Sequence, residues 1–259
     1  MFSLFRYAYR KCIDNPKRSV LILGLQNAGK TSLLNDIRLL AGQEASGPVV
    51  PTVGQNYCKF SKGGYEFTIN DLGGQPNFRD SWKFYFNVAD VVVYVIDSND
   101  KQKFEESFRE FKKLIHHKLL RFCPIFICAN KQDEPNSLSA DKIDSLLSFS
   151  KECGTKRTFA IIETIAAGEK KHKGASDIIS LCIDKFKNDK FLAQRIELRE
   201  SGLLEEDQIS SDSEDNELKN LPLPNIEDLK DLENQDPLKV ELDENQNENQ
   251  NENQDEKEL

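Results

Sequence analysis

Residues 20–31 read Val-Leu-Ile-Leu-Gly-Leu-Gln-Asn-Ala-Gly-Lys-Thr, and this stretch decides the fold. A short apolar run leads into a glycine, four residues and Gly-Lys-Thr, the pattern of a loop whose backbone N–H groups wrap a polyphosphate. Lys30 would lie along the β- and γ-phosphates, and the Thr31 hydroxyl would bind Mg²⁺. The amphipathic stretch 32–40 predicts a helix with its positive end toward the phosphates. The predicted phosphate-binding residues are Gly24, Leu25, Gln26, Asn27, Ala28, Gly29, Lys30, Thr31 and Ser32.

The chain of 259 residues carries its charge unevenly. Residues 203–259 hold 20 acidic and 4 basic side chains, whereas the remainder is mildly basic. The long apolar runs lie within residues 19–190 and suffice for one core, but the acidic end has too few apolar residues to bury. We therefore expect an amphipathic helix at residues 1–17, one globular domain at residues 18–197, and a disordered acidic tail at residues 198–259.

The six cysteines show neither a CxxC pair nor a metal-ligand spacing, a pattern typical of buried thiols in a reducing compartment. No apolar run reaches the 18 residues that would suggest a membrane span, and the N-terminus lacks the apolar core of a signal peptide. We expect a cytoplasmic protein, peripheral on the cytosolic face of a membrane, with no nucleic-acid partner.

Residues 2–13 predict a short basic amphipathic helix, because Phe2, Phe5 and Tyr9 recur at helical spacing among basic side chains. Such a helix can fold back on its own domain or lie on an anionic lipid surface. Because a dozen residues bind a membrane weakly, a second signal is expected, and Cys12 is the lipidation candidate, as an acceptor of a reversible acyl chain.

Strand and helix patterns alternate after the phosphate-binding loop. Two strands joined by a tight turn are predicted at residues 56–61 and 65–71, and further strands at residues 91–96, 124–129 and 158–164. Helices are expected at residues 104–115, from near Leu138 and from about Ala175. With the strand before the loop, this alternation predicts an α/β fold: a mostly parallel six-stranded sheet with helices on both faces and a ligand at the C-terminal edge of the strands.

Two segments fall where the terminal phosphate and a metal ion would need them. Asp71, after the second hairpin strand, can hold Mg²⁺ through water, and Gly74 can offer its N–H to a γ-phosphate at close approach. Thr52 lies in the loop before the hairpin, where its hydroxyl could close over Mg²⁺. The predicted metal-binding residues are therefore Thr31, Thr52 and Asp71.

Two further segments fall where a base would bind. In the run from Asn130 through Lys131 to Asp133, the last carboxylate can accept two N–H bonds from the guanine edge, which adenine cannot supply. The run Thr164-Ile165-Ala166 follows the next strand and could close over the base from the other side. This pair of segments indicates a guanine nucleotide rather than an adenine nucleotide.

These residues resemble the small GTPases and, within them, the Arf and Arf-like family. The resemblance rests on Gly24-Leu25, on Pro51-Thr52-Val53-Gly54, on Asp71-Leu72-Gly73-Gly74-Gln75 with Arg79, Trp82, Tyr85 and Phe86, and on Asn130-Lys131-Gln132-Asp133. It implies the P-loop small GTPase fold, GTP/GDP and Mg²⁺ as ligands, and Ala166 as an N–H donor to the guanine oxygen. It also implies an exchange factor and an activating protein as partners. The first 25 residues look like two branches of the family, one ciliary with long tails and one at the Golgi.

Three positions depart from the family pattern. Gln26 stands where the family usually has Asp, Gln55 where it usually has Phe, and Asn70 where it almost always has Trp. Together with Tyr85, which is retained, the last two positions make the effector-facing aromatic trio of the family. Because buried aromatics are the usual anchors of an interface, we expect an effector unlike the usual Arf effectors.

The leading hypothesis is a GTP-dependent switch in which Gln75 orients the attacking water. Hydrolysis is expected to be slow until a partner supplies an arginine, since Arg79, the remaining candidate in cis, is structural in the resembling family. One alternative is a nucleotide-dependent scaffold, or a promoter of exchange on another small GTPase, with little hydrolysis of its own. Gln26 and the altered effector surface favour that alternative, whereas intact Gln75 and Thr52 favour the enzyme. An ATP-using P-loop enzyme is disfavoured by Asp133.

Overall fold

The structure is a computed structural model that describes residues 15–45, 52, 54–154, 157–166 and 173–202. By its internal contacts the chain divides into two units, Met1–Pro222 and Leu223–Leu259, and every described residue belongs to the first. The helix expected at residues 2–13, the lipidation candidate Cys12 and the acidic tail beyond residue 202 lie outside the described residues.

Six strands form one sheet in the order β2-β3-β1-β4-β5-β6. The strands are β1 (Lys17–Leu23), β2 (Gln55–Lys62), β3 (Tyr65–Leu72), β4 (Val91–Asp97), β5 (Ile125–Asn130) and β6 (Phe159–Glu163). Only β2 runs antiparallel to its neighbour, β3, and the other neighbouring pairs are parallel. The predicted mostly parallel six-stranded sheet is confirmed.

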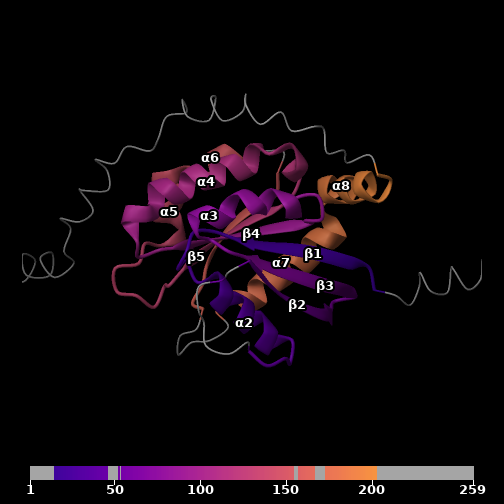
Figure 1. Cartoon of the computed structure of the whole chain (residues 1–259), viewed down its shortest axis with the longest axis horizontal. Coiled ribbons are helices and arrows are strands. Elements are labelled where there is room, and N and C mark those ends of the chain that lie inside the picture. Colours follow the sequence, from indigo (N-terminus) through magenta and orange to yellow (C-terminus); the bar gives the residue numbers. More distant parts are fainter. Residues whose placement is uncertain (1–14, 46–51, 53, 155–156, 167–172, 203–259) are drawn as a thin grey trace, which may run out of the picture. The chain divides into compact units, whose positions relative to one another are not determined.

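Helices cover both faces of this sheet (Figure 1). The α-helices are α2 (Lys30–Leu40), α3 (Pro76–Arg79), α4 (Phe104–His116), α5 (Ala140–Leu147), α6 (Phe149–Cys153), α7 (Ala175–Asn188) and α8 (Lys190–Glu200). The 3₁₀ helices are η1 (Asp80–Tyr85), η2 (Lys101–Lys103) and η3 (Lys118–Leu120). Helices α2 and α7 cover one face and α4 and α6 the other. Within the described ranges, no helix combines the length and the apolar character that crossing a bilayer requires.

The burial of each strand follows from its place in the sheet. Residues 91–96 of β4 are all buried and apolar, as expected for a central parallel strand with helices on both faces. The hairpin strand β2 lies at the edge, so its side chains alternate: Cys58 packs in the core under α2 and α7, while Tyr57 beside it is 55% exposed. The continuous apolar runs at residues 91–96 and 124–129 thus correspond to strands with buried side chains along the whole run.

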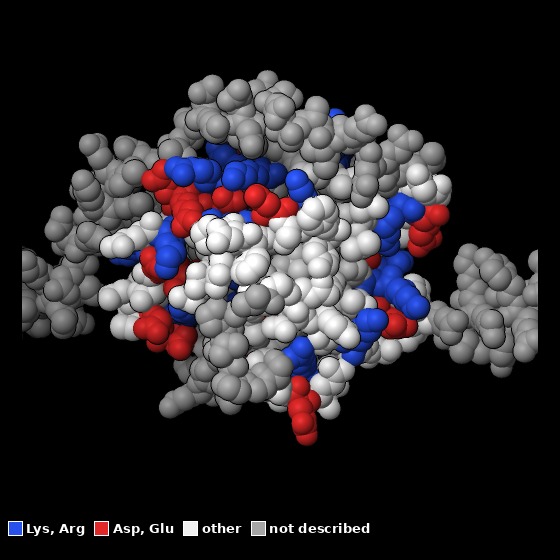
Figure 2. Space-filling model, viewed as in Figure 1, with Lys and Arg blue, Asp and Glu red and all other residues white. Residues whose placement is uncertain are grey.

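Charged side chains of opposite sign alternate over α4. Figure 2 shows blue and red atoms side by side in this part of the face. Arg109 pairs with Glu105 at 2.6 Å, and Lys113 pairs with Glu110 at 3.1 Å, each one turn apart on the helix. Such exposed pairs contribute only a few tenths of a kcal/mol each, so they support the helix rather than determine the fold.

Helix α8 is tied to the sheet by a buried arginine. Arg195 is 1% exposed, and its guanidinium donates to the carbonyl oxygens of Ala89 at 3.1 and 3.0 Å, of Phe86 at 2.8 Å, and of Leu119. One turn further on, Arg199 forms an ion pair at 2.7 Å with the buried carboxylate of Asp90. This helix ends at Glu200, past residue 197, where the sequence placed the end of the domain.

We predict that Arg195→Ala lowers the free energy of unfolding by about 3–5 kcal/mol, because it leaves three buried carbonyl groups without their donor. Urea unfolding followed by circular dichroism measures this loss. The matched control is Gln194→Ala, since Gln194 is the exposed neighbour on the same helix and should change stability by less than about 0.5 kcal/mol. Equal stability of the two variants would show that α8 is only loosely attached.

Candidate functional site

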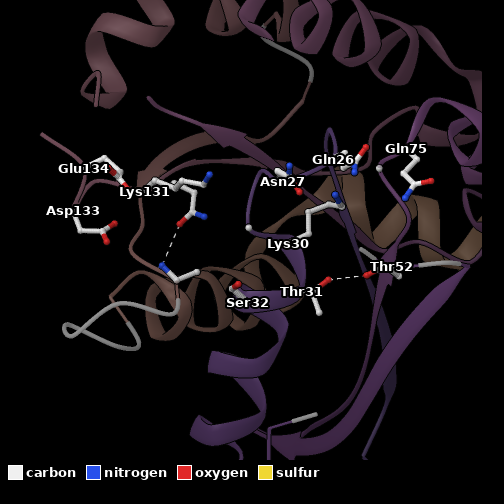
Figure 3. Close-up of a pocket in the computed structure, with 14 residues that line it drawn as sticks. Gln26, Asn27, Lys30, Thr31, Ser32, Thr52, Gln75, Lys131, Asp133 and Glu134 are labelled. Carbon is white, nitrogen blue, oxygen red and sulfur yellow. Dashed lines mark hydrogen bonds between the residues drawn. The ribbon is translucent and has the colours of Figure 1, made fainter. Parts of the chain in front are cut away.

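A pocket of about 470 Å³ lies where β1, β3 and β5 end. Most of the predicted site residues line it: Gln26, Asn27, Gly29, Lys30, Thr31, Ser32, Thr52, Gly74, Gln75, Asn130, Lys131, Asp133 and Ala166. Figure 3 shows side chains from these separate segments pointing into one space. The structure therefore brings together residues that are more than 100 positions apart in the sequence.

Five predicted residues, Gly24, Leu25, Ala28, Asp71 and Ile165, lie behind this lining. The carbonyl oxygens of Leu25 and Ala28 accept hydrogen bonds at 2.8 Å, from Lys30 Nζ and from Asn130 Nδ2 respectively. Gly24 has a φ of +139°, and a Cβ there would collide with the carbonyl oxygen of Val95. Gly24, Leu25 and Ala28 therefore shape the loop through backbone groups, whereas Asp71 contributes its side chain.

The phosphate-binding loop opens directly into helix α2, which begins at Lys30. Gly29, with a φ of +96°, packs so closely against the amide of Asn130 that a Cβ would not fit. The first N–H groups of a helix have no partner within the helix. Because those of α2 point at the pocket, its floor suits an anion with several oxygens.

Lys30 lies at this floor. Its Nζ donates to Leu25 O at 2.8 Å, and burial lowers the pKa of the ammonium group to about 8, although the nearby Asp71 raises it. A Cβ on Gly74 would lie 2.5 Å from Lys30 Nζ, so glycine is required for this close approach. The segment that follows β3 therefore meets the phosphate-binding loop directly.

Three oxygen-bearing side chains converge beside Lys30. The Thr31 hydroxyl donates to Asp71 Oδ2 at 2.6 Å, and the hydroxyl oxygens of Thr31 and Thr52 lie 2.8 Å apart (Figure 3). The other carboxylate oxygen, Asp71 Oδ1, is buried and has no hydrogen-bond partner among the described residues, and burial raises the pKa of the carboxyl group.

This oxygen set fits Mg²⁺. Hydroxyl and carboxylate oxygens are its preferred ligands, and it usually keeps several waters and substrate phosphate oxygens. In the described part of the chain, no three His, Cys, Asp or Glu residues gather as metal ligands, so Thr31, Thr52 and Asp71 would share the ion with phosphate and water.

Asn130 joins the two ends of the pocket. Its Nδ2 donates to Ala28 O in the phosphate-binding loop, and its Oδ1 accepts from the Thr164 hydroxyl at 3.0 Å and from the Ala166 N–H at 3.2 Å. The sequence assigned the Ala166 N–H to a guanine oxygen; here it donates to Asn130. At 3.2 Å this bond is at the long end of the normal range, so the same N–H can be shared with a ligand.

The other end of the pocket carries Lys131, Asp133 and Glu134. Lys131 has a φ of +65°, and its Nζ contacts Asp97 Oδ2 at 2.5 Å. Asp97 and Glu134 were not identified from the sequence. Asp97 lies at the end of β4, next to β5. Because site residues gather at the C-terminal ends of parallel strands, this position in the sequence could have identified it.

Two side chains bind the backbone just before Gln75. Trp82 Nε1 donates to Gly73 O at 2.9 Å, and Arg79 Nε donates to Gly74 O at 3.0 Å. The Arg79 guanidinium also pairs with Glu106 at 2.7 Å and with Glu110 at 3.7 Å. Arg79 is therefore engaged in bonds that position the backbone before Gln75, and Gln75 itself lines the pocket.

The three expected effector-surface residues differ in exposure. Gln55 is exposed and accepts a hydrogen bond from the Tyr85 hydroxyl. Asn70 is only 8% exposed, and it lies on β3, between β2 and β1. Two aromatics near this polar pair in sequence, Tyr57 at 55% and Phe84 at 74% exposure, were not identified from the sequence.

Comparisons with known proteins agree with this geometry. Residues 5–183 match the ADP-ribosylation factor family. The chain is 35% identical over 171 residues to ADP-ribosylation factor-like protein 13B of Chlamydomonas reinhardtii, a match that covers 65% of this chain but only 32% of that protein. It is 38% identical over 128 residues to ADP-ribosylation factor-like protein 3 of the same organism, covering 49% of this chain and 70% of that protein.

Solved structures share the fold. The Arl6 BBS3 small GTPase from Trypanosoma brucei, with bound nucleotide analogue GppNp, matches with a TM-score of 0.58 and 25% identity, covering 69% of this chain and 99% of that chain. The mammalian SRP receptor structure, at 21% identity and a TM-score of 0.54, covers 64% of this chain and 99% of that chain and shares the fold alone. The chain therefore belongs to the ADP-ribosylation factor family, and it is an Arf-like small GTPase, a GTP-binding switch.

Proposed function

We propose that the chain binds GTP and GDP with Mg²⁺, hydrolyses GTP slowly, and controls membrane, ciliary or Golgi trafficking through partners that bind its GTP form. The observation that carries the proposal is that one pocket has Lys30 near one end and Asp133 at the other (Figure 3). A cation at a helix N-terminus suits phosphates, and a carboxylate at the far end suits the guanine edge.

At the phosphate end, Lys30 and the N–H groups of α2 bind the β- and γ-phosphates. Thr31, Thr52 and Asp71 hold Mg²⁺, which, when bound, neutralises the charge that develops on the transferred phosphoryl group. The Thr52 hydroxyl closes over Mg²⁺ when the terminal phosphate is present, and the Gly74 N–H donates to that phosphate. Because they lie on two different loops, loss of that phosphate releases both loops.

At the base end, Asp133 accepts two N–H bonds from guanine. The aliphatic stem of Lys131 covers the base, and its ion pair with Asp97 holds the stem in place. Ile165 and Ala166 close the other side, with the Ala166 N–H shared between Asn130 Oδ1 and the guanine oxygen. Asn130 fixes the spacing between this end and the phosphates.

Hydrolysis depends on Gln75, which orients the attacking water. The bonds of Arg79 to Gly74 O and to Glu106 keep its guanidinium from acting in cis. The intrinsic rate is therefore on the order of 10⁻⁴ to 10⁻³ s⁻¹ until an activating protein supplies an arginine. An exchange factor is the matching partner for release of GDP.

Membrane contact is proposed for the basic amphipathic residues 2–13, with Cys12 as an acyl acceptor, which places the protein on a cytosolic membrane face. The effector differs from the usual Arf effectors, because Gln55 and Asn70 replace two of the three aromatics, and the retained Tyr85 donates its hydroxyl to Gln55. The chain spans about a third of the 13B relative, so partners of that whole protein are not transferred to it.

A second candidate function is a nucleotide-dependent scaffold, or a promoter of exchange on another small GTPase. The neutral Gln26 at the phosphate end favours it, because this residue could disturb the position of the attacking water. A single-turnover hydrolysis assay with and without cell extract separates the two functions. Extract-stimulated turnover supports the enzyme, whereas persistent GTP in both conditions supports the scaffold.

We predict that purified protein carries guanine nucleotides and that Asp133→Asn shifts its preference to xanthine nucleotides. Xanthine has a carbonyl oxygen where guanine has its exocyclic amine. The amide N–H of the introduced Asn can donate to this oxygen, whereas the Asp carboxylate can only accept. Competition between GDP and XDP measures the shift, which we expect to exceed tenfold. Bound adenine nucleotide in the wild-type protein, or an unchanged preference in the variant, would contradict the proposed base site.

We predict that Gln75→Leu retains GTP binding but loses turnover stimulated by an activating protein, because the leucine cannot orient water. Phosphate release in cell extract measures the loss, expected to be at least a hundredfold. Asn77→Leu, at an exposed position two residues further along, is the control for a surface leucine in this segment. Stimulated turnover equal to wild type in Gln75→Leu would exclude the catalytic role.

We predict that nucleotide affinity falls above pH 8. In the free protein the pKa of Lys30 is lowered to about 8, whereas bound phosphates favour the charged ammonium form. Well below pH 8 the group is charged in both states, so affinity is flat. As the pH rises through 8 to 9 the free protein loses most of this proton, and affinity falls by up to about tenfold. Fluorescent GDP titrations measure the profile. Lys30→Arg, which stays charged, should give a flat profile over this range and controls for titration of the nucleotide.

A further inference from the structure

The phosphate end of the pocket is lined by side-chain amides as well as by Lys30. Gln26 and Asn27 from the phosphate-binding loop and Gln75 from the segment after β3 all line it. Among the described residues, none of these three side chains has a hydrogen-bond partner. Gln26 and Gln75 are half-buried and Asn27 is exposed, so their amide N–H groups are available to a ligand that enters the pocket.

Charge is divided between the two ends of the pocket. The carboxylates that line it, Asp133 and Glu134, both lie at the base end (Figure 3). The carboxylate of Asp71 faces Thr31 and Thr52 from behind the lining. The loop side of the phosphate end thus presents an ammonium group and neutral amides to a ligand, with no carboxylate among its described lining residues.

Gln26 is placed beside the position of a terminal phosphate. A Cβ on Gly74 would lie 2.5 Å from Lys30 Nζ and 2.6 Å from the carbonyl carbon of Leu25, the atom bonded to the Gln26 nitrogen. The loop backbone at Gln26, the ammonium group and Gly74 therefore meet at one point. In Figure 3 the Gln26, Gln75 and Lys30 side chains all lie toward the end of the pocket that is away from Asp133.

We propose that Gln26 is a specificity-determining residue that favours the triphosphate over the diphosphate. Its amide N–H donates to an oxygen of the terminal phosphate, which a diphosphate lacks, and its neutrality avoids repelling the added charge. A carboxylate at the same position would repel that charge at short range, where salt screens weakly. This inference rests on the proposed function of the pocket, and it concerns the balance between nucleotide states rather than hydrolysis.

The test uses the full-length chain with Mg²⁺ and compares the dissociation constants of a non-hydrolysable GTP analogue and of GDP. Gln26→Glu keeps the shape and adds a charge, whereas Gln26→Met keeps the length and removes the amide. Gln194→Glu, on the exposed side of α8, makes the same chemical change outside the pocket. The measured quantity is the ratio of the two constants, so a general loss of affinity cancels.

We expect Gln26→Glu to shift this ratio at least tenfold toward GDP, Gln26→Met to shift it about threefold to fivefold, and Gln194→Glu to leave it unchanged. A ratio within twofold of wild type for either Gln26 variant overturns the proposal. Should Gln26→Glu fail to fold, as judged by thermal melting, Gln26→Met decides. A wild-type protein that binds neither GTP analogue nor GDP refutes the proposed function itself, and the two failures are therefore distinguishable.

Discussion

The bonds of the Asn130 side chain fix the distance on which this site depends. One amide group donates to Ala28 O in the phosphate-binding loop and accepts from Thr164 and Ala166 at the base end. A nucleotide is a ligand of fixed length, so its base and its phosphates are bound together only if the two subsites keep a constant spacing. Buried and fully bonded networks of this kind are rigid, because each group that loses a partner costs about 1–3 kcal/mol.

Side chains from several elements also hold the segment that follows β3. The segment after β3 is tied near its start, where Trp82 and Arg79 donate to the carbonyls of Gly73 and Gly74. It is tied again just after its end, where Arg195 of α8 donates to Phe86 O. Between these ties lie α3 and η1, where Trp82 is buried and Arg79 pairs with Glu106. Helix α8 thus contacts the chain just after the segment that bears Gln75.

Features that depend on local pattern were predictable from the sequence, and features that depend on long-range packing were not. The loop at residues 24–31, the strands at residues 91–96 and 124–129 and the base motif ending at Asp133 each show a local signal, and the structure places them as expected. Arg195 showed none, because a charged residue in a polar helix normally faces solvent. Asp97 and the burial of Asn70 depend on strand order, which the sequence does not state. For these three residues, tertiary contacts rather than residue type determine the position of the side chain.

Burial of Lys30 and Asp71 explains why such a site can act as a switch. Both charges are removed from water, which shifts the two pKa values toward neutrality, and neither group has its full set of hydrogen bonds within the described protein. Their mutual attraction offsets only part of this cost, as is usual for buried ion pairs. The remaining partners come from phosphate, metal ion and water, so ligand binding contributes stability that the protein alone lacks. Under the proposed function, loss of one phosphate removes partners of these buried groups, and this loss links the nucleotide state to the segment that carries Gly74.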